Sequence, residues 1–198
     1  TVDEDGYCRI RPYRYPEGER PAVTARHSYD ALKSDCAKEV YDALYESAYI
    51  VSPELSDRDP SFYAIRPIVL DNTGYTAVDI NAALIALLDD HPELFWLYGG
   101  VSFALSGDEY TVIFPFSLYP PEEIIEIMTA MDTAISALID DAPAGSDDYT
   151  LERYIHDHLV DACTYDEAAE SAEDYFEYPY ASKANGAIVD HAALCEGY

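Results

Sequence analysis

The fold is decided by residues 93–120, which read ELFWLYGGVSFALSGDEYTVIFPFSLYP. Their β-branched and aromatic runs are typical of strands, and Gly99-Gly100 and the SGDE stretch at 106–109 divide them as turns would. We therefore expect two or three antiparallel strands. Trp96 is the only tryptophan. We expect it to seal the core between strands and helices, with a carbohydrate-binding platform as the alternative.

Amphipathic helices are predicted on both sides of these strands. Apolar residues recur at helical spacing after Ser28, a good N-cap, and a second helix extends over 76–92, where Pro92 ends it. After the strands, 120–142 and 149–163 also have helical spacing. Residues 62–70, FYAIRPIVL, are predicted to form one strand. This mixture of helices with a small antiparallel sheet predicts an α+β fold.

The pattern divides the chain into three regions. Proline-rich residues 1–26 are expected to form an extended arm, and residues 27–142 an accessory α+β module. The break PAGSDD at 143–148 is followed by a third region, 147–198, whose centre is acidic and predicted to be a loop.

Composition excludes several classes of function. With 39 acidic and 11 basic residues, the net charge of −28 would repel nucleic acids and anionic membranes. No apolar stretch has the length of a membrane span. Nineteen tyrosines argue for a folded chain. Acidity with little lysine suits an extracellular, cell-surface or salt-adapted protein, and the chain starts without Met, as it would after removal of a leader or anchor.

The remaining polar residues predict no metal site and no cofactor. Cys8 and Cys36 form the preferred pair if one disulfide exists, and four free thiols are the alternative. His156 and His158 are two positions apart on a predicted helix, so they cannot grip one ion together, and we expect His156 to pack and His158 to be exposed. The acidic pairs at 89–90, 122–123 and 147–148 are interpreted as solvated helix caps.

The third region carries a set of spaced motifs. It contains LERYIHDHLVDACTYD at 151–166 and ANGAIVDHAALCEGY at 184–198. Together they resemble the bacterial transglutaminase-like superfamily, whose fold is papain-like. The corresponding elements are a His-Asp pair, a Tyr-Asp pair, a Gly-Ala-aliphatic strand and a cysteine followed by Glu, Gly and Tyr. In this chain they fall at 156–157, 165–166, 186–189 and 195–198.

The resemblance implies that Cys195 is the nucleophile of an acyl-transfer reaction on a protein or peptide substrate. A thiolate at a helix start would attack a glutamine carboxamide or a peptide carbonyl, and an amine or water would resolve the thioester. The chain departs from the family at His191 and Ala192, where a glycine and a basic residue are common. The family's catalytic His and Asp follow the cysteine, so we expect the chain to be the front part of a longer enzyme, inactive alone.

Two other functions stay open at this point. The chain is a surface interaction module if its transglutaminase-like domain has lost activity. It is a regulatory or pro-segment if residues 1–140 shield the cysteine. The acyl acceptor and the oligomeric state are left open by the sequence.

Overall fold

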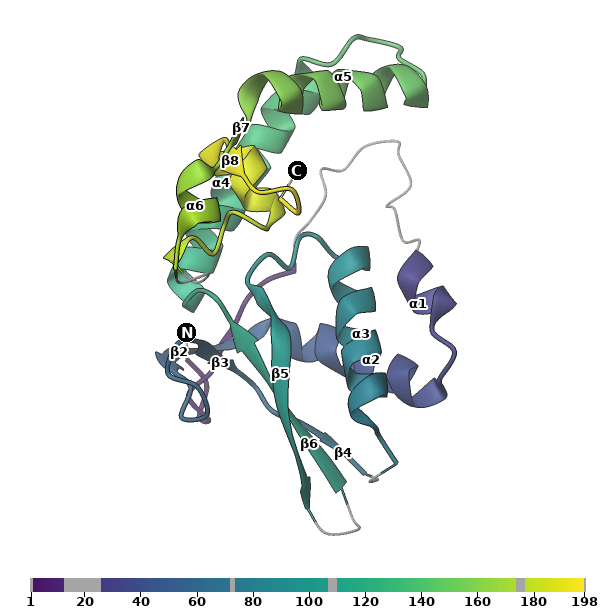
Figure 1. Cartoon of the computed structure of the whole chain (residues 1–198), viewed down its shortest axis with the longest axis vertical. Coiled ribbons are helices and arrows are strands. Elements are labelled where there is room, and N and C mark those ends of the chain that lie inside the picture. Colours follow the sequence, from purple (N-terminus) through teal and green to yellow (C-terminus); the bar gives the residue numbers. More distant parts are fainter. Residues whose placement is uncertain (1, 13–25, 72–73, 107–109, 174–176, 198) are drawn as a thin grey trace. The chain divides into compact units, whose positions relative to one another are not determined.

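The α+β fold is confirmed in a computed structural model of the chain (Figure 1), which describes residues 2–12, 26–71, 74–106, 110–173 and 177–197. The chain forms two compact units, residues 1–124 and 125–198. The division falls inside the helix α4 (Pro121–Asp140), ahead of the boundary predicted between 142 and 147. No helix in the described ranges combines the length and the apolar run needed to cross a bilayer.

The first unit contains one antiparallel sheet. Its strands run in the order β1-β2-β3-β6-β4, and β5 pairs with the other side of β6. The predicted strand at 62–70 is broken at Arg66-Pro67 into two pieces that both pair with β6. The described strands are β1 (Cys8–Arg9), β2 (Ile50–Leu55), β3 (Tyr63–Ile65), β4 (Ile68–Leu70), β5 (Leu97–Ser106) and β6 (Tyr110–Ser117).

Residues 93–120 form two strands, β5 and β6, within the expected range. The Gly99-Gly100 pair does not form a turn, because β5 continues through it. The pairing register of β5 shifts between Leu97 and Val101, so the glycines lie in a bulge.

One predicted helix of the first unit is divided in two, whereas the next begins where the sequence predicts. The helix predicted from Ser28 is interrupted, because α1 (His27–Ala31) is a short separate helix. The next helix, α2 (Asp35–Ala48), begins after Ser34, whose hydroxyl accepts from the Ala37 amide. The α3 helix (Ala77–Asp90) has a capping box, in which Thr76 and Asp79 bond to each other's backbone N–H groups.

Trp96 has the structural role that the sequence predicted. Its side chain is fully buried, and its indole N–H donates to the Ala48 carbonyl at 2.9 Å. The Phe95 and Tyr49 rings pack against the Trp96 ring in T-shaped arrangements. Their ring centres lie 5.1 Å and 5.7 Å from the Trp96 ring centre. A buried indole offers no platform to a sugar, so the alternative interpretation of Trp96 as a carbohydrate platform is wrong.

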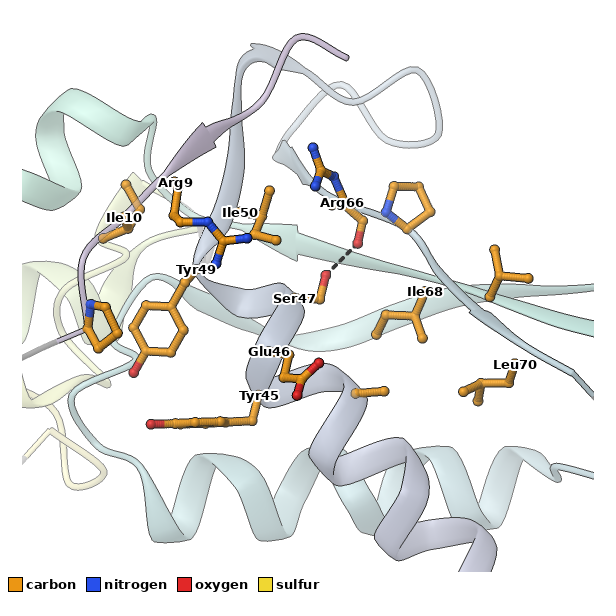
Figure 2. Close-up of a pocket in the computed structure, with 14 residues that line it drawn as sticks. Arg9, Ile10, Tyr45, Glu46, Ser47, Tyr49, Ile50, Arg66, Ile68 and Leu70 are labelled. Carbon is orange, nitrogen blue, oxygen red and sulfur yellow. Dashed lines mark hydrogen bonds between the residues drawn. The ribbon is translucent and has the colours of Figure 1, made fainter. Parts of the chain in front are cut away.

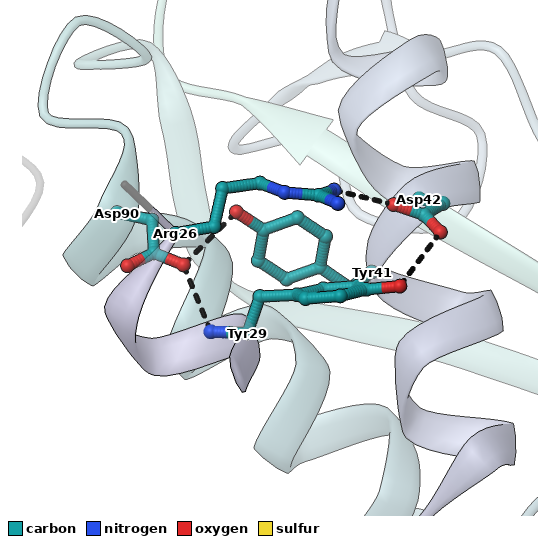
Figure 3. A network of polar contacts seen from close by, with 5 residues as sticks. All are labelled: Arg26, Tyr29, Tyr41, Asp42 and Asp90. Carbon is teal, nitrogen blue, oxygen red and sulfur yellow. Dashed lines mark hydrogen bonds and ion pairs between the residues drawn. The ribbon is translucent and has the colours of Figure 1, made fainter. Parts of the chain in front are cut away.

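The carboxylate of Asp90 connects α3 to α1 (Figure 3). It accepts the backbone N–H groups of Ser28 and Tyr29, both at 2.9 Å, and the Tyr41 hydroxyl at 3.1 Å. Burial raises the pKa of Asp90, but these hydrogen bonds outweigh it and leave the pKa below the ordinary value. Asp90 was predicted to be a solvated cap of its own helix. It instead caps the N-terminus of a helix some 60 residues earlier in the chain.

Arg26 closes the other side of this network. Its guanidinium lies 3.9 Å from the centre of the Tyr29 ring and donates to Asp42 at 2.9 Å. The Tyr29 hydroxyl donates to the same carboxylate at 3.3 Å. The α1 helix has no buried residue, so it is held mainly by these polar and ring contacts.

Part of the expected N-terminal arm is joined to the sheet. Cys8 and Arg9 pair with β2, and Ile10 donates its N–H to the Tyr49 carbonyl at 2.7 Å. Ahead of them the chain turns at Gly6, whose φ of 88° favours glycine. Residues 13–25 of the predicted arm lie outside the described residues.

The second unit combines helices with a two-stranded parallel sheet. Asp147 caps its α5 helix by accepting the Thr150 amide, as expected of an acidic pair at a helix start. The Gly186–Asp190 segment is a π-helical turn, so the strand predicted at 186–189 is wrong. Besides α4, the elements are α5 (Asp148–Ala162), β7 (Thr164–Tyr165), α6 (Glu167–Ser171), η2 (Gly186–Asp190) and β8 (Ala192–Ala193).

Candidate functional site

Cys195 is exposed in a tight turn directly after β8. The Gly197 N–H donates to the Leu194 carbonyl at 2.9 Å and closes the turn, while the Leu194 N–H donates to the Ala181 carbonyl at 2.7 Å. The described residues show this turn and no helix after the cysteine. Cys195 therefore owes its position to backbone hydrogen bonds on both sides.

Two glycines allow the backbone around this turn to pack closely. A Cβ added to Gly197 would lie 2.4 Å from the Ala181 carbonyl oxygen, and one added to Gly186 would lie 2.4 Å from the Tyr180 carbonyl oxygen. Both distances are shorter than van der Waals contact with a fixed backbone atom allows. The sterics at Gly197 thus account for the glycine of the Cys-Glu-Gly-Tyr motif without reference to catalysis.

The Tyr-Asp pair of the predicted motif is brought next to the cysteine segment. Tyr165 pairs in parallel register with Ala193, and the Asp166 N–H donates to the Ala193 carbonyl at 3.0 Å. Burial raises the pKa of Tyr165, and the charges of Glu170 and Cys195 raise it further, so these two side chains lie near its phenol.

Asp166 connects two segments that lie next to the turn. Its carboxylate accepts the Ala169 N–H and the Tyr180 hydroxyl, both at 2.9 Å. The Ala169 hydrogen bond is the main reason that the pKa of Asp166 is lowered. Burial and the bond to Asp166 raise the pKa of Tyr180 to about 12. The geometry gives Asp166 a structural role.

Two residues near the turn were missed by the sequence interpretation. Lys183 is half-buried, and burial lowers its pKa while the nearby Glu196 carboxylate opposes the shift. Asn185 is 1 % exposed, and its Oδ1 has no hydrogen-bond partner among the described residues. A polar residue before the Gly-Ala pair was the only signal in the sequence, and no spacing rule picks it out.

The histidines lie apart from this arrangement. No hydrogen bond joins Cys195 to a histidine within the described part of the chain. The His156 side chain is 70 % exposed and contacts Asp157 at 3.2 Å, so the prediction that His156 packs is wrong. His158 is exposed, as expected. His191 holds the left-handed φ of 54° at the end of η2, and its carbonyl accepts the Thr164 N–H.

All four cysteines are free, so the alternative of four thiols applies and the Cys8–Cys36 pairing does not. Cys163 is buried with Ala187 and Ala193 in the small core of the second unit. Cys195 is the exposed member of the four, whereas Cys8 and Cys36 are half-buried. Cys195 is therefore the accessible thiol, and the other three are buried or half-buried.

A shallow apolar groove of about 200 Å³ also lies within the second unit. It is formed by the last turns of α4, the second half of α5 and the η2 turn, and His158 and His191 are its polar members. Its other lining residues are aliphatic, so this unit leaves apolar surface uncovered.

No protein-family model matches this sequence, and no curated protein is similar to it at a significant level. The assignment to a transglutaminase-like family therefore stays a prediction from the motif residues.

Proposed function

We propose that this chain supplies the nucleophile of a cysteine-dependent acyl-transfer enzyme, as the front part of an extracellular or cell-surface transglutaminase-like protein. The observation that carries the proposal is the placement of Cys195, an exposed thiol on a turn fixed by backbone hydrogen bonds and by the close packing of Gly197. A nucleophile has to be accessible to substrate and held in one position.

In the proposed reaction, the Cys195 sulfur attacks the carbonyl carbon of a glutamine side chain or a peptide bond. The C–N bond breaks, ammonia or an amine leaves with a proton, and a thioester remains. A second amine or water then attacks the thioester and regenerates the thiol. The proton transfers require a base, and none of the described histidines bonds to Cys195. The resemblance implies that this base is a histidine that follows Cys195 in the longer enzyme, so we propose that the 198-residue chain lacks it.

The test compares amine incorporation into a glutamine-containing peptide, and peptide cleavage, by two proteins. One is the protein from the full reading frame and the other is the 198-residue chain. We expect turnover by the first that Cys195→Ala abolishes, and none by the second. Cys163→Ala is the matched control because it removes a buried thiol. If the 198-residue chain shows turnover and Cys195→Ala abolishes it, the proposal that this chain lacks a base is wrong.

An interaction module with a degenerate domain is the second candidate, and the uncovered groove of the second unit favours it. It predicts that the complete protein transfers no acyl group although Cys195 reacts with iodoacetamide. Inactivity of the full-length protein toward every glutamine and peptide substrate would therefore replace the first proposal with this one.

A further inference from the structure

A larger pocket, of about 600 Å³, lies in the first unit where the end of α2 meets β1 and β4 (Figure 2). Its volume is within the range of small-molecule sites. None of its lining residues belongs to the second unit. The buried side chains that form its apolar part include Ile10, Tyr49, Ile50, Ile68 and Leu70.

Two arginines line this pocket, but only one is available to a ligand. Arg66 is hydrogen-bonded to Asp3 and has Asp5 at 3.7 Å, and its guanidinium points away from the other lining residues. The backbone carbonyl of Arg66 accepts the Ser47 hydroxyl, which fixes the bend before β4. Arg9 is exposed, and its guanidinium lies between Ile50 and Tyr49 at the pocket.

Arg9 meets an opposite charge across the pocket, on Glu46 of α2. The two side chains form no ion pair with each other, since no nitrogen-to-oxygen distance between them falls within 4.0 Å. Among the described residues, neither has another ion-pair partner. The pocket thus offers one separate cation and one separate anion to whatever enters it.

The charges decide which ligands fit. A simple anion would meet Glu46 and the field of a chain with net charge −28, and a simple cation would meet Arg9. A ligand with both charges and no net charge escapes both penalties. Its carboxylate would accept charge-assisted hydrogen bonds from Arg9, and its ammonium group would donate to Glu46.

The aromatic wall favours an apolar group between the two charges. The Tyr45 ring is held between Tyr49, at 5.5 Å between ring centres, and His91, at 4.5 Å. The His91 imidazole is in turn bonded to Glu93 at 2.7 Å. A wall fixed before binding loses little side-chain entropy when a ligand packs against it.

We propose that this pocket binds a zwitterionic α-amino acid or short peptide with an apolar side chain, held by Arg9 at its carboxylate and by Glu46 at its ammonium group. The site is independent of Cys195 and of the acyl-transfer proposal, so Cys195→Ala leaves binding unchanged.

Isothermal titration of the 198-residue chain tests the proposal with four probes. L-Phenylalanine and the dipeptide leucyl-phenylalanine carry both charges. N-acetyl-phenylalanine lacks the ammonium group, and phenylalanine amide lacks the carboxylate. We expect both zwitterions to bind and each blocked analogue to bind about tenfold more weakly or worse, as the loss of a charged hydrogen bond implies. Tighter binding of the dipeptide identifies a peptide ligand, and the reverse identifies a free amino acid.

Two variants connect each charge to its residue. In Arg9→Gln the amide should bind as well as phenylalanine, and in Glu46→Gln the acetyl analogue should do so. Arg11→Gln and Glu54→Gln remove the same charges from exposed residues outside the pocket and should leave all four affinities unchanged. The fluorescence of buried Trp96 reports whether each variant is folded.

Two results would overturn the proposal. The first is the absence of binding by either zwitterion at millimolar concentration. The second is equal binding of the zwitterions and both blocked analogues by the unchanged chain, which would leave Arg9 and Glu46 without a role.

Discussion

The two units of this protein are stabilised in different ways. The first buries large aromatic and aliphatic side chains around Trp96, whereas one buried cluster of the second joins the small side chains of Cys163, Ala187 and Ala193, with Leu159 beside it. Side-chain volume specifies the first unit, and close backbone approach at glycines specifies the turn that carries Cys195 in the second. Substitutions in each unit test this difference.

The largest effect is expected at Trp96. Trp96→Ala removes a fully buried ring and its hydrogen bond to Ala48, and it should lower the free energy of unfolding by about 3–5 kcal/mol. Val160→Ala in the second unit should change it by less than about 0.5 kcal/mol, because the side chain is mostly exposed. Urea unfolding followed by circular dichroism measures both. Similar losses in the two variants would contradict the burial of the Trp96 side chain as a main source of stability in the first unit.

Backbone packing is tested at Gly197. Gly197→Ala forces a methyl group against the Ala181 carbonyl, so the second unit should lose about 1–3 kcal/mol. Hydrogen exchange of the Leu194 amide, which donates to that carbonyl, reports the loss locally. Gly99→Ala is the matched control, since its nearest neighbour would be a Leu88 methyl at 3.9 Å. Unchanged protection of Leu194 would mean that the turn can shift without cost.

Charge stabilises the first unit at Asp90, and the effect should depend on pH. Because the folded pKa of Asp90 lies below the ordinary 3.8, its contribution is present above that pH and is lost as the pH falls through the folded value. Asp90→Asn should cost about 1–3 kcal/mol at pH 7 and less at pH 2.5. Asp89→Asn, which changes an exposed neighbour, should cost little at either pH. The free energy of unfolding of each variant is measured between pH 2.5 and 7. If the loss in Asp90→Asn does not depend on pH, the cap does not depend on an ionised Asp90.

The smallest effect distinguishes the two serines before α2. Ser34→Ala removes the hydroxyl that caps this helix and should cost about 1 kcal/mol. Ser28→Ala should stay within about 0.5 kcal/mol, since it is the backbone of Ser28 that Asp90 binds. Thermal unfolding of both variants measures this difference in stability. If Ser28→Ala lowers the stability more than Ser34→Ala, the Ser28 side chain caps a helix, as the sequence predicts.

Local patterns in the sequence were reliable where local physics decides the structure. The α3 helix, the β5–β6 pair and the burial of Trp96 all follow from spacing, caps and residue type. The failures have partners far away in the chain. Ser28 has the residue type of a cap, but Asp90 fixes its backbone. The GAIV stretch has the composition of a strand, but the Gly186 backbone lies close to the Tyr180 and Ala192 carbonyls and the segment forms a π-helical turn.

The candidate site was predicted only in part. The motif includes Tyr165 and Asp166, but it did not predict that their segment pairs with β8, directly before Cys195. It could not predict that Lys183 and Asn185 are partly or fully buried near the turn, since burial depends on packing between segments. The pocket of the first unit went unnoticed because Arg9 and Glu46 come from segments 37 positions apart in an otherwise acidic sequence.

The Asp90 cap also sets an order of events during folding. The α1 helix has five residues and buries none of them, so it cannot persist before its partner exists. That partner stands at the end of α3, and the intervening loop closes only when α2 and α3 have docked. We therefore expect the native contacts of α1 to form after the rate-limiting step, and this helix to open more readily than α2 and α3 in the folded protein. Substitutions at Asp90 should accordingly speed unfolding and leave the folding rate almost unchanged.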